Sequence, residues 1–123
     1  MRSAAEIPPP LELECLKALW TLGEGNVKEV REILTRNRKL AYTTVMTVLD
    51  RLEKRGGVER RKQGRLYVYV PVVSRDTLRR LAVDALVGDF FDGSESRLGE
   101  YLRGEGEREV RTARESRMET SLL

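Results

Sequence analysis

The chain has 123 residues, of which 40% are hydrophobic and 35% charged, and its formal net charge is +3. This composition fits a soluble, helix-rich protein better than a fully disordered chain. One cysteine and no histidine exclude an internal disulfide and argue against zinc sites and histidine-assisted catalysis, so we expect no metal, no cofactor and no enzymatic activity.

The charges are unevenly distributed along the chain. Residues 36–65 carry ten cations and three anions, whereas the part from Ser74 onward carries nine arginines and eleven Asp and Glu residues. A basic patch confined to one segment is the electrostatic footprint of a protein that binds a polyanion. The alternative is a solvated basic surface without a partner.

Two helices are predicted ahead of the basic segment. After a flexible leader (residues 1–8) and a stiff proline entry, a first helix is expected over Leu11–Leu22. Its lone cysteine, Cys15, lies in an apolar run and is interpreted as a buried, inert thiol. Asn26 followed by Glu29 forms a capping-box pattern that starts a second helix.

A third helix is predicted to begin near Tyr42. Its buried face follows from the i, i+3, i+4, i+7 spacing of Val45, Val48, Leu49 and Leu52. The opposite face carries short polar side chains and a methionine, which can bond base edges or touch thymine methyls in the major groove of DNA. Without an outward Arg, Asn or Gln in mid-helix, we expect modest specificity per half-site. The alternative is that these are ordinary exposed helix residues.

A basic hairpin follows the third helix. Leu66, Val68 and Val70 alternate with Arg65, Tyr67 and Tyr69, the period of a half-buried strand, and a turn at Gln63-Gly64 joins it to a strand that begins at Val58. The predicted phosphate contacts are Arg51 and Lys54 toward the helix end and Arg61, Lys62 and Arg65 clustered at the hairpin tip. Tyr67 either donates a hydrogen bond to a phosphate or packs at the rim.

Three helices followed by a basic hairpin is the order of a winged helix-turn-helix domain. We expect this domain at residues 9–73, in a mainly α protein with a small β-wing.

Residues 74–103 are predicted to form a helical dimerisation region, because apolar stripes without a partner in so small a domain favour a symmetric pair. The alternative is that these helices fold back on their own domain. The residues assigned to the dimer are Leu78, Leu81, Ala82, Ala85, Leu86, Phe90, Leu98, Tyr101 and Leu102. Residues 104–123 are predicted to be a charged, weakly ordered tail.

Four stretches of the chain form a recognisable set of motifs: A-Y-T-T-V-M-T-V-L-D-R-L-E-K-R-G (Ala41–Gly56), E-x-x-x-L-K-x-L-W (Glu12–Trp20), V-K-E-V-R-E-x-L (Val27–Leu34) and G-R-x-Y-x-Y-x-P (Gly64–Pro71). Together they resemble the penicillinase-repressor (BlaI/MecI-like) family. The resemblance implies a homodimeric winged-helix transcriptional repressor that binds a palindromic operator through the third helix. It places Arg51 on a backbone-contacting position, and the base-reading positions fall on Thr43, Thr44, Met46 and Thr47.

The resemblance also implies that repression is relieved when a membrane sensor protease system cleaves the C-terminal part. Tyr101-Leu102 aligns where the staphylococcal members carry the cleaved Asn-Phe bond. The copper-responsive branch, with its C-terminal cysteine cluster, is excluded because Cys15 is the only cysteine.

The rival interpretation is a winged-helix protein-interaction module without specific DNA binding, because a fold alone does not fix function. The cations of the hairpin and the polar outer face of the third helix favour DNA. No stretch of about 20 apolar residues and no signal peptide is present, so we expect a cytoplasmic protein without membrane insertion.

Overall fold

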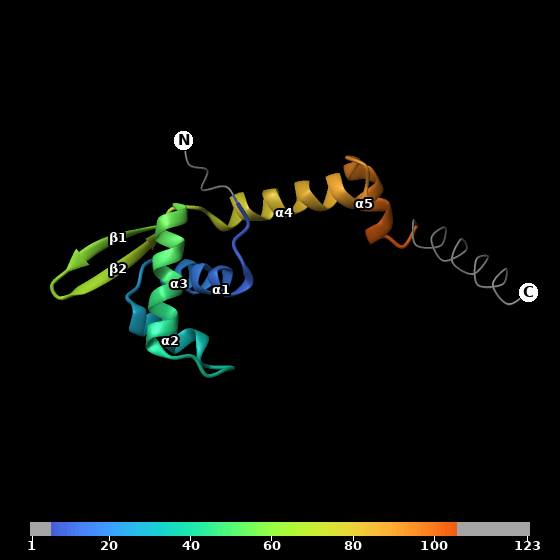
Figure 1. The fold of residues 1–123 in the computed structure, drawn as a ribbon. Coiled ribbons are helices and arrows are strands. Elements are labelled where there is room, and N and C mark those ends of the chain that lie inside the picture. Colours follow the sequence, from blue (N-terminus) through green and yellow to red (C-terminus); the bar gives the residue numbers. More distant parts are fainter. Residues whose placement is uncertain (1–5, 106–123) are drawn as a thin grey trace, which may run out of the picture. The chain divides into compact units, whose positions relative to one another are not determined.

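The computed structural model describes residues 6–105. Along this part the order is α1 (Pro10–Leu22), α2 (Val27–Leu34), α3 (Tyr42–Arg55), β1 (Val58–Gln63), β2 (Leu66–Pro71), α4 (Arg75–Phe90) and α5 (Glu95–Leu102). In Figure 1, α1, α2 and α3 gather together and the β1–β2 hairpin projects from them. The predicted class, a mainly helical winged helix-turn-helix, is confirmed. Most of the predicted leader and almost all of the predicted tail lie outside the described residues.

The chain divides into two compact units, and the boundary falls inside α4 between Ala82 and Val83. The core of the first unit is built by apolar residues of all three N-terminal helices and of the hairpin. The predicted inner face of α3 is confirmed, since none of its four members is more than 4% exposed: Val45, Val48, Leu49 and Leu52. Burial of this stripe fixes which side of α3 remains open to solvent.

Local signals set the helix ends. Asn26 Oδ1 accepts a hydrogen bond from the Glu29 N–H at 2.9 Å, and Glu29 Oε1 accepts one from the Asn26 N–H at 2.9 Å, so the predicted capping box is present. At the C-terminal end of α3, Gly56 adopts a φ of 84°, a left-handed conformation that stops this helix just before β1.

The hairpin differs from its prediction in two details. Gln63 pairs with Leu66, so the turn residues are Gly64 and Arg65 instead of Gln63-Gly64. The predicted alternation was wrong at the base of β2, where Tyr69 is 1% exposed while Leu66, near the tip, is 52% exposed. The base of the hairpin is covered on both faces, whereas the tip extends beyond the core and has nothing to pack against.

Tyr69 is also held by its backbone. Its N–H donates to the Gly25 carbonyl at 2.8 Å, and its carbonyl accepts from the Gly25 N–H at 3.0 Å, so the α1–α2 loop adds a short bridge to the edge of β2. The bridge ties the wing to the helical core.

The start of α4 belongs to the first unit. Ser74 Oγ accepts a hydrogen bond from the Thr77 N–H at 3.0 Å, which confirms the predicted cap. The expectation that the α4 stripe has no partner in its own domain was wrong for its first members. Leu78 is 6% exposed within the core, and Leu81 packs against that core. The alternative prediction, that these helices fold back on their own domain, therefore holds for Leu78 and Leu81.

The second unit contains the end of α4 and α5. Ser94 caps α5 by accepting a hydrogen bond from the Arg97 N–H, and the rings of Phe91 and Tyr101 lie 5.6 Å apart. Phe90 and Leu102 are 75% and 74% exposed. In the part of the chain that the structure describes, no helix is long and apolar enough to cross a bilayer.

Candidate nucleic-acid interface

The outward face of α3 carries the residues predicted to read bases. The side chains of Thr43, Thr44, Met46 and Thr47 are all exposed on its first two turns. A shallow hollow beside them is lined by the three threonines together with Arg51 and Leu11 of α1. The face is thus polar, with methyl groups interspersed, and one turn further on it carries a cation.

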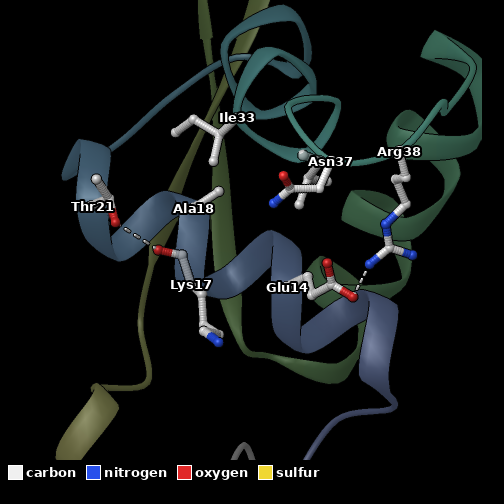
Figure 2. A pocket seen from close by; sticks show the side chains of 8 residues that line it. Glu14, Lys17, Ala18, Thr21, Ile33, Asn37 and Arg38 are labelled. Atoms are coloured by element: carbon white, nitrogen blue, oxygen red, sulfur yellow. Dashed lines mark hydrogen bonds and ion pairs between the residues drawn. The ribbon is translucent and has the colours of Figure 1, made fainter.

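The connector before α3 is held from two sides. Arg31 of α2 donates from Nε to the Leu40 carbonyl at 2.8 Å. Figure 2 shows Arg38 of the connector pointing toward Glu14 of α1, with which it forms an ion pair, above a hollow that Asn37 also lines. These contacts fix where α3 begins, and they partly compensate one cation of the basic segment.

The far end of α3 is fixed to α1 by Arg55 and Glu12. Glu12 is only 4% exposed, and its Oε1 lies 2.9 Å from Nε of Arg55. Because an unpaired buried carboxylate is strongly destabilising, the arginine is needed for this packing. Arg55 therefore has a structural role in the packing of α3 against α1.

A cluster at the junction of α3 and the wing was missed by the sequence analysis. The Tyr69 hydroxyl donates to Asp50 Oδ1 at 3.0 Å, and Arg60 lies with NH1 3.5 Å from the same oxygen. The Arg60 guanidinium also lies 4.3 Å from the centre of the Tyr67 ring. Arg60 is exposed and pre-positioned beside α3. The signal available in the sequence was the spacing of Arg60 and Lys62, which puts both side chains on one face of the strand.

Arg61 lies on the other face of the hairpin. It forms a bidentate pair with Glu24 of the α1–α2 loop, with nitrogen–oxygen distances of 3.0 and 2.6 Å. This hydrogen bonding lowers the pKa of Glu24 below its ordinary value. The structure therefore separates Arg61 from Lys62 and Arg65, with which it was predicted to cluster. The side chains of Lys62, Arg65 and Tyr67 are exposed on the distal half of the hairpin, and Lys54 is exposed on α3.

In the range 6–105, no three His, Cys, Asp or Glu side chains gather as metal ligands would. Cys15 is fully buried, and burial raises the pKa of its thiol to about 12. A thiol so protonated is a weak nucleophile, in agreement with its predicted inert role.

An open helix face beside a basic hairpin, on a three-helix core, defines a winged helix-turn-helix protein. The sequence matches the penicillinase repressor family over residues 9–103. The chain belongs to this family, which confirms the resemblance seen in its motifs. The family consists of repressors and not of enzymes.

Two curated relatives show how far the similarity extends. The transcriptional regulator BlaI of Mycobacterium tuberculosis is 46% identical over 78 residues, which are 62% of this chain and 56% of the relative. The penicillinase repressor of Bacillus licheniformis is 29% identical over 83 residues, or 68% of this chain and 65% of the relative. The chain thus spans between half and two thirds of the length of these relatives.

Two solved structures are similar to about three fifths of this chain. The solution structure of the DNA-binding domain of the repressor BlaI has a TM-score of 0.54 and 31% identity, and the match covers 63% of this chain and 93% of that one. The monomeric form of Bacillus licheniformis BlaI in complex with the blaP half-operator has a TM-score of 0.51 and 30% identity, with coverages of 59% and 89%.

Proposed function

We propose that this protein is a sequence-specific DNA-binding transcriptional repressor that inserts α3 into the major groove. The observation that carries the proposal is the exposed polar face of α3. Exposed cations of the wing flank this face, and α3 itself is anchored at both ends. The similarity to a repressor in complex with its half-operator supports this placement of the helix.

Base reading is assigned to Thr43, Thr44, Met46 and Thr47. Their hydroxyls and methyls suit mixed hydrogen-bonding and apolar contacts to base edges. None of them makes the bidentate contact that Arg, Asn or Gln gives. One half-site therefore supplies limited discrimination, and a selective repressor needs two.

Phosphate contacts are assigned to the cations that the fold leaves accessible. On α3 these are Arg51 and Lys54, and on the wing they are Arg60, Lys62 and Arg65, with the hydroxyl of Tyr67 as an additional donor. Arg61 is removed from this set, because its guanidinium is engaged by Glu24 on the opposite face.

We further propose that two copies bind a palindromic operator as a homodimer. The second unit exposes apolar side chains that a partner copy would bury, chiefly Phe90 (75% exposed), Leu102 (74%), Tyr101 (48%) and Leu86 (40%). Ala82, Ala85 and Leu98 lie nearby in sequence and stay in the proposed interface. Leu78 and Leu81 contribute to the core of the first unit instead.

Relief of repression is proposed to follow cleavage of the C-terminal region through a membrane sensor system. Separating the dimer-forming residues from the reading unit would leave single half-site binders, whose affinity is too low for repression. The peptide bond Tyr101-Leu102 is a candidate position, because both side chains are exposed at the end of α5.

Selection of genomic DNA fragments by the purified protein, followed by sequencing, tests the proposal. A repressor of this kind enriches a small set of fragments that share an inverted repeat. Recovery of a random sample of the genome would instead favour the protein-interaction module.

A further inference from the structure

An apolar hollow lies between α1 and the first turns of α4. None of the residues that line it is assigned a DNA contact, and only Ala82 belongs to the proposed dimer interface. Its walls are the side chains of Leu13 and Trp20 from α1, Leu78 from α4 and Ile7 from the segment before α1. The hollow measures about 240 Å³, which holds roughly eight water-sized groups at about 30 Å³ each.

Three cations border this hollow, and no carboxylate lines it. They are Lys17 of α1 and Arg75 and Arg79 of α4. The Arg75 guanidinium lies 5.0 Å from the centre of the Trp20 ring. Lys17 also lines the hollow between α1 and α2, but in Figure 2 its ammonium end points away from Ile33 and Asn37. Among the described residues, neither Lys17 nor Arg79 forms an ion pair.

We propose that this hollow is a binding site for a small amphipathic carboxylate. An alkyl chain would lie against Leu13, Trp20 and Leu78, and the carboxylate would accept hydrogen bonds from Lys17 and Arg79 at the rim. Apolar walls with a few convergent polar groups are the usual composition of a small-ligand site. A hollow that is bordered by three cations and by no carboxylate favours an anionic ligand over a neutral or cationic amphiphile.

The site lies beside the segment that connects the wing to α4. The Trp20 indole N–H donates to the Val73 carbonyl at 2.9 Å, on the segment that connects the wing to α4. A ligand against Trp20 therefore touches the side chain that holds this segment. The binding inference itself does not depend on the proposed DNA-binding function.

The single tryptophan of the chain provides a direct test, since Trp20 lines the site. Octanoate has a seven-carbon alkyl chain, which fits this volume with the carboxylate at the rim. It is titrated into the full chain below its micelle concentration. We expect a saturable change in Trp20 fluorescence. Octanol and octylamine, matched in length but neutral and cationic, are expected to bind about tenfold or more weakly, the loss that follows from a missing charge-assisted contact.

Variants locate the site. Lys17→Met and Arg79→Gln should each weaken octanoate binding about tenfold. Lys28→Met, which changes an exposed lysine of α2 away from the hollow, should bind as the wild type does. Equal binding of octanoate and octanol, or wild-type binding by both site variants, would overturn the proposal. Octanoate that binds only after the protein is made monomeric would also overturn it, because a second copy would then be the occupant of the hollow.

Discussion

The hydroxyl of Tyr69 donates a hydrogen bond to Oδ1 of Asp50 across 3.0 Å and so joins the wing to the helix proposed to read DNA. Tyr69 is 1% exposed, while the Asp50 side chain is 39% exposed. The contact therefore connects the buried base of the hairpin to the accessible side of α3. Since Arg60 approaches the same carboxylate, Asp50 of α3 contacts both a buried residue of the wing and one of its exposed cations.

Tyr69→Phe should lower the free energy of unfolding by about 1 kcal/mol, because it removes one buried hydrogen bond and keeps the ring. Denaturant unfolding measures the change. Tyr67→Phe is the matched control, since the Tyr67 ring is 44% exposed and its hydroxyl makes no hydrogen bond to another described residue. If both variants lose the same stability, the bond between Tyr69 and Asp50 does not contribute as we expect.

Stability should also depend on pH through Tyr69. Burial of the hydroxyl, and then its hydrogen bond to Asp50, raise the pKa of Tyr69 above its ordinary value. A group whose pKa is higher in the folded state stabilises the protein fully below its unfolded pKa of about 10, and this contribution is lost as the pH rises through the folded pKa. Unfolding at pH values from 8 to about 11 should therefore show a smaller alkaline loss for Tyr69→Phe than for the wild type. Parallel curves would refute the pKa argument.

The proposed phosphate contacts can be separated from the paired arginine by salt dependence. Arg51→Ala and Lys62→Ala should each weaken binding to all DNA and reduce the slope of log affinity against log salt by about one unit. Arg61→Ala serves as the control, because its charge is engaged by Glu24 and the slope should stay near that of the wild type. A loss of slope in Arg61→Ala, or none in the other two, would reverse the assignment.

Phe90→Asp should convert the proposed dimer into monomers, since it places a charge on the most exposed aromatic side chain of the second unit. Sedimentation velocity reports the state. Leu66→Asp makes the same kind of change at an exposed leucine of the wing and should leave the dimer intact. Leu81→Asp is less informative, because Leu81 packs against the core and its replacement would also weaken the fold. A dimeric Phe90→Asp variant would place the interface elsewhere.

The elements that depend on neighbouring residues were predictable from the sequence. The capping box of Asn26 and Glu29 and the apolar face from Val45 to Leu52 are set by spacings within one or two helical turns. Their positions follow from propensity and periodicity, and the structure agrees with both.

The errors came from contacts between distant parts of the chain. Tyr69 is 1% exposed at a place where its backbone pairs with Gly25, 44 positions earlier. Strand alternation alone places Arg61 on the face opposite Lys62, but its pairing with Glu24 of the α1–α2 loop is a long-range contact. Leu78 reaches the core only because α4 starts beside α1. A strand period or a helical stripe shows which side chains share a face. What covers that face depends on tertiary packing, which these patterns do not contain.

The central claim, that α3 reads DNA sequence, is tested most directly by Thr47→Ala. Its affinity and that of the wild type are measured for the operator recovered from genomic selection and for a scrambled duplex of equal length. The account predicts that Thr47→Ala loses affinity for the operator by about 1 kcal/mol or more and changes little on the scrambled duplex. Equal losses on both duplexes would contradict a base-reading role for α3.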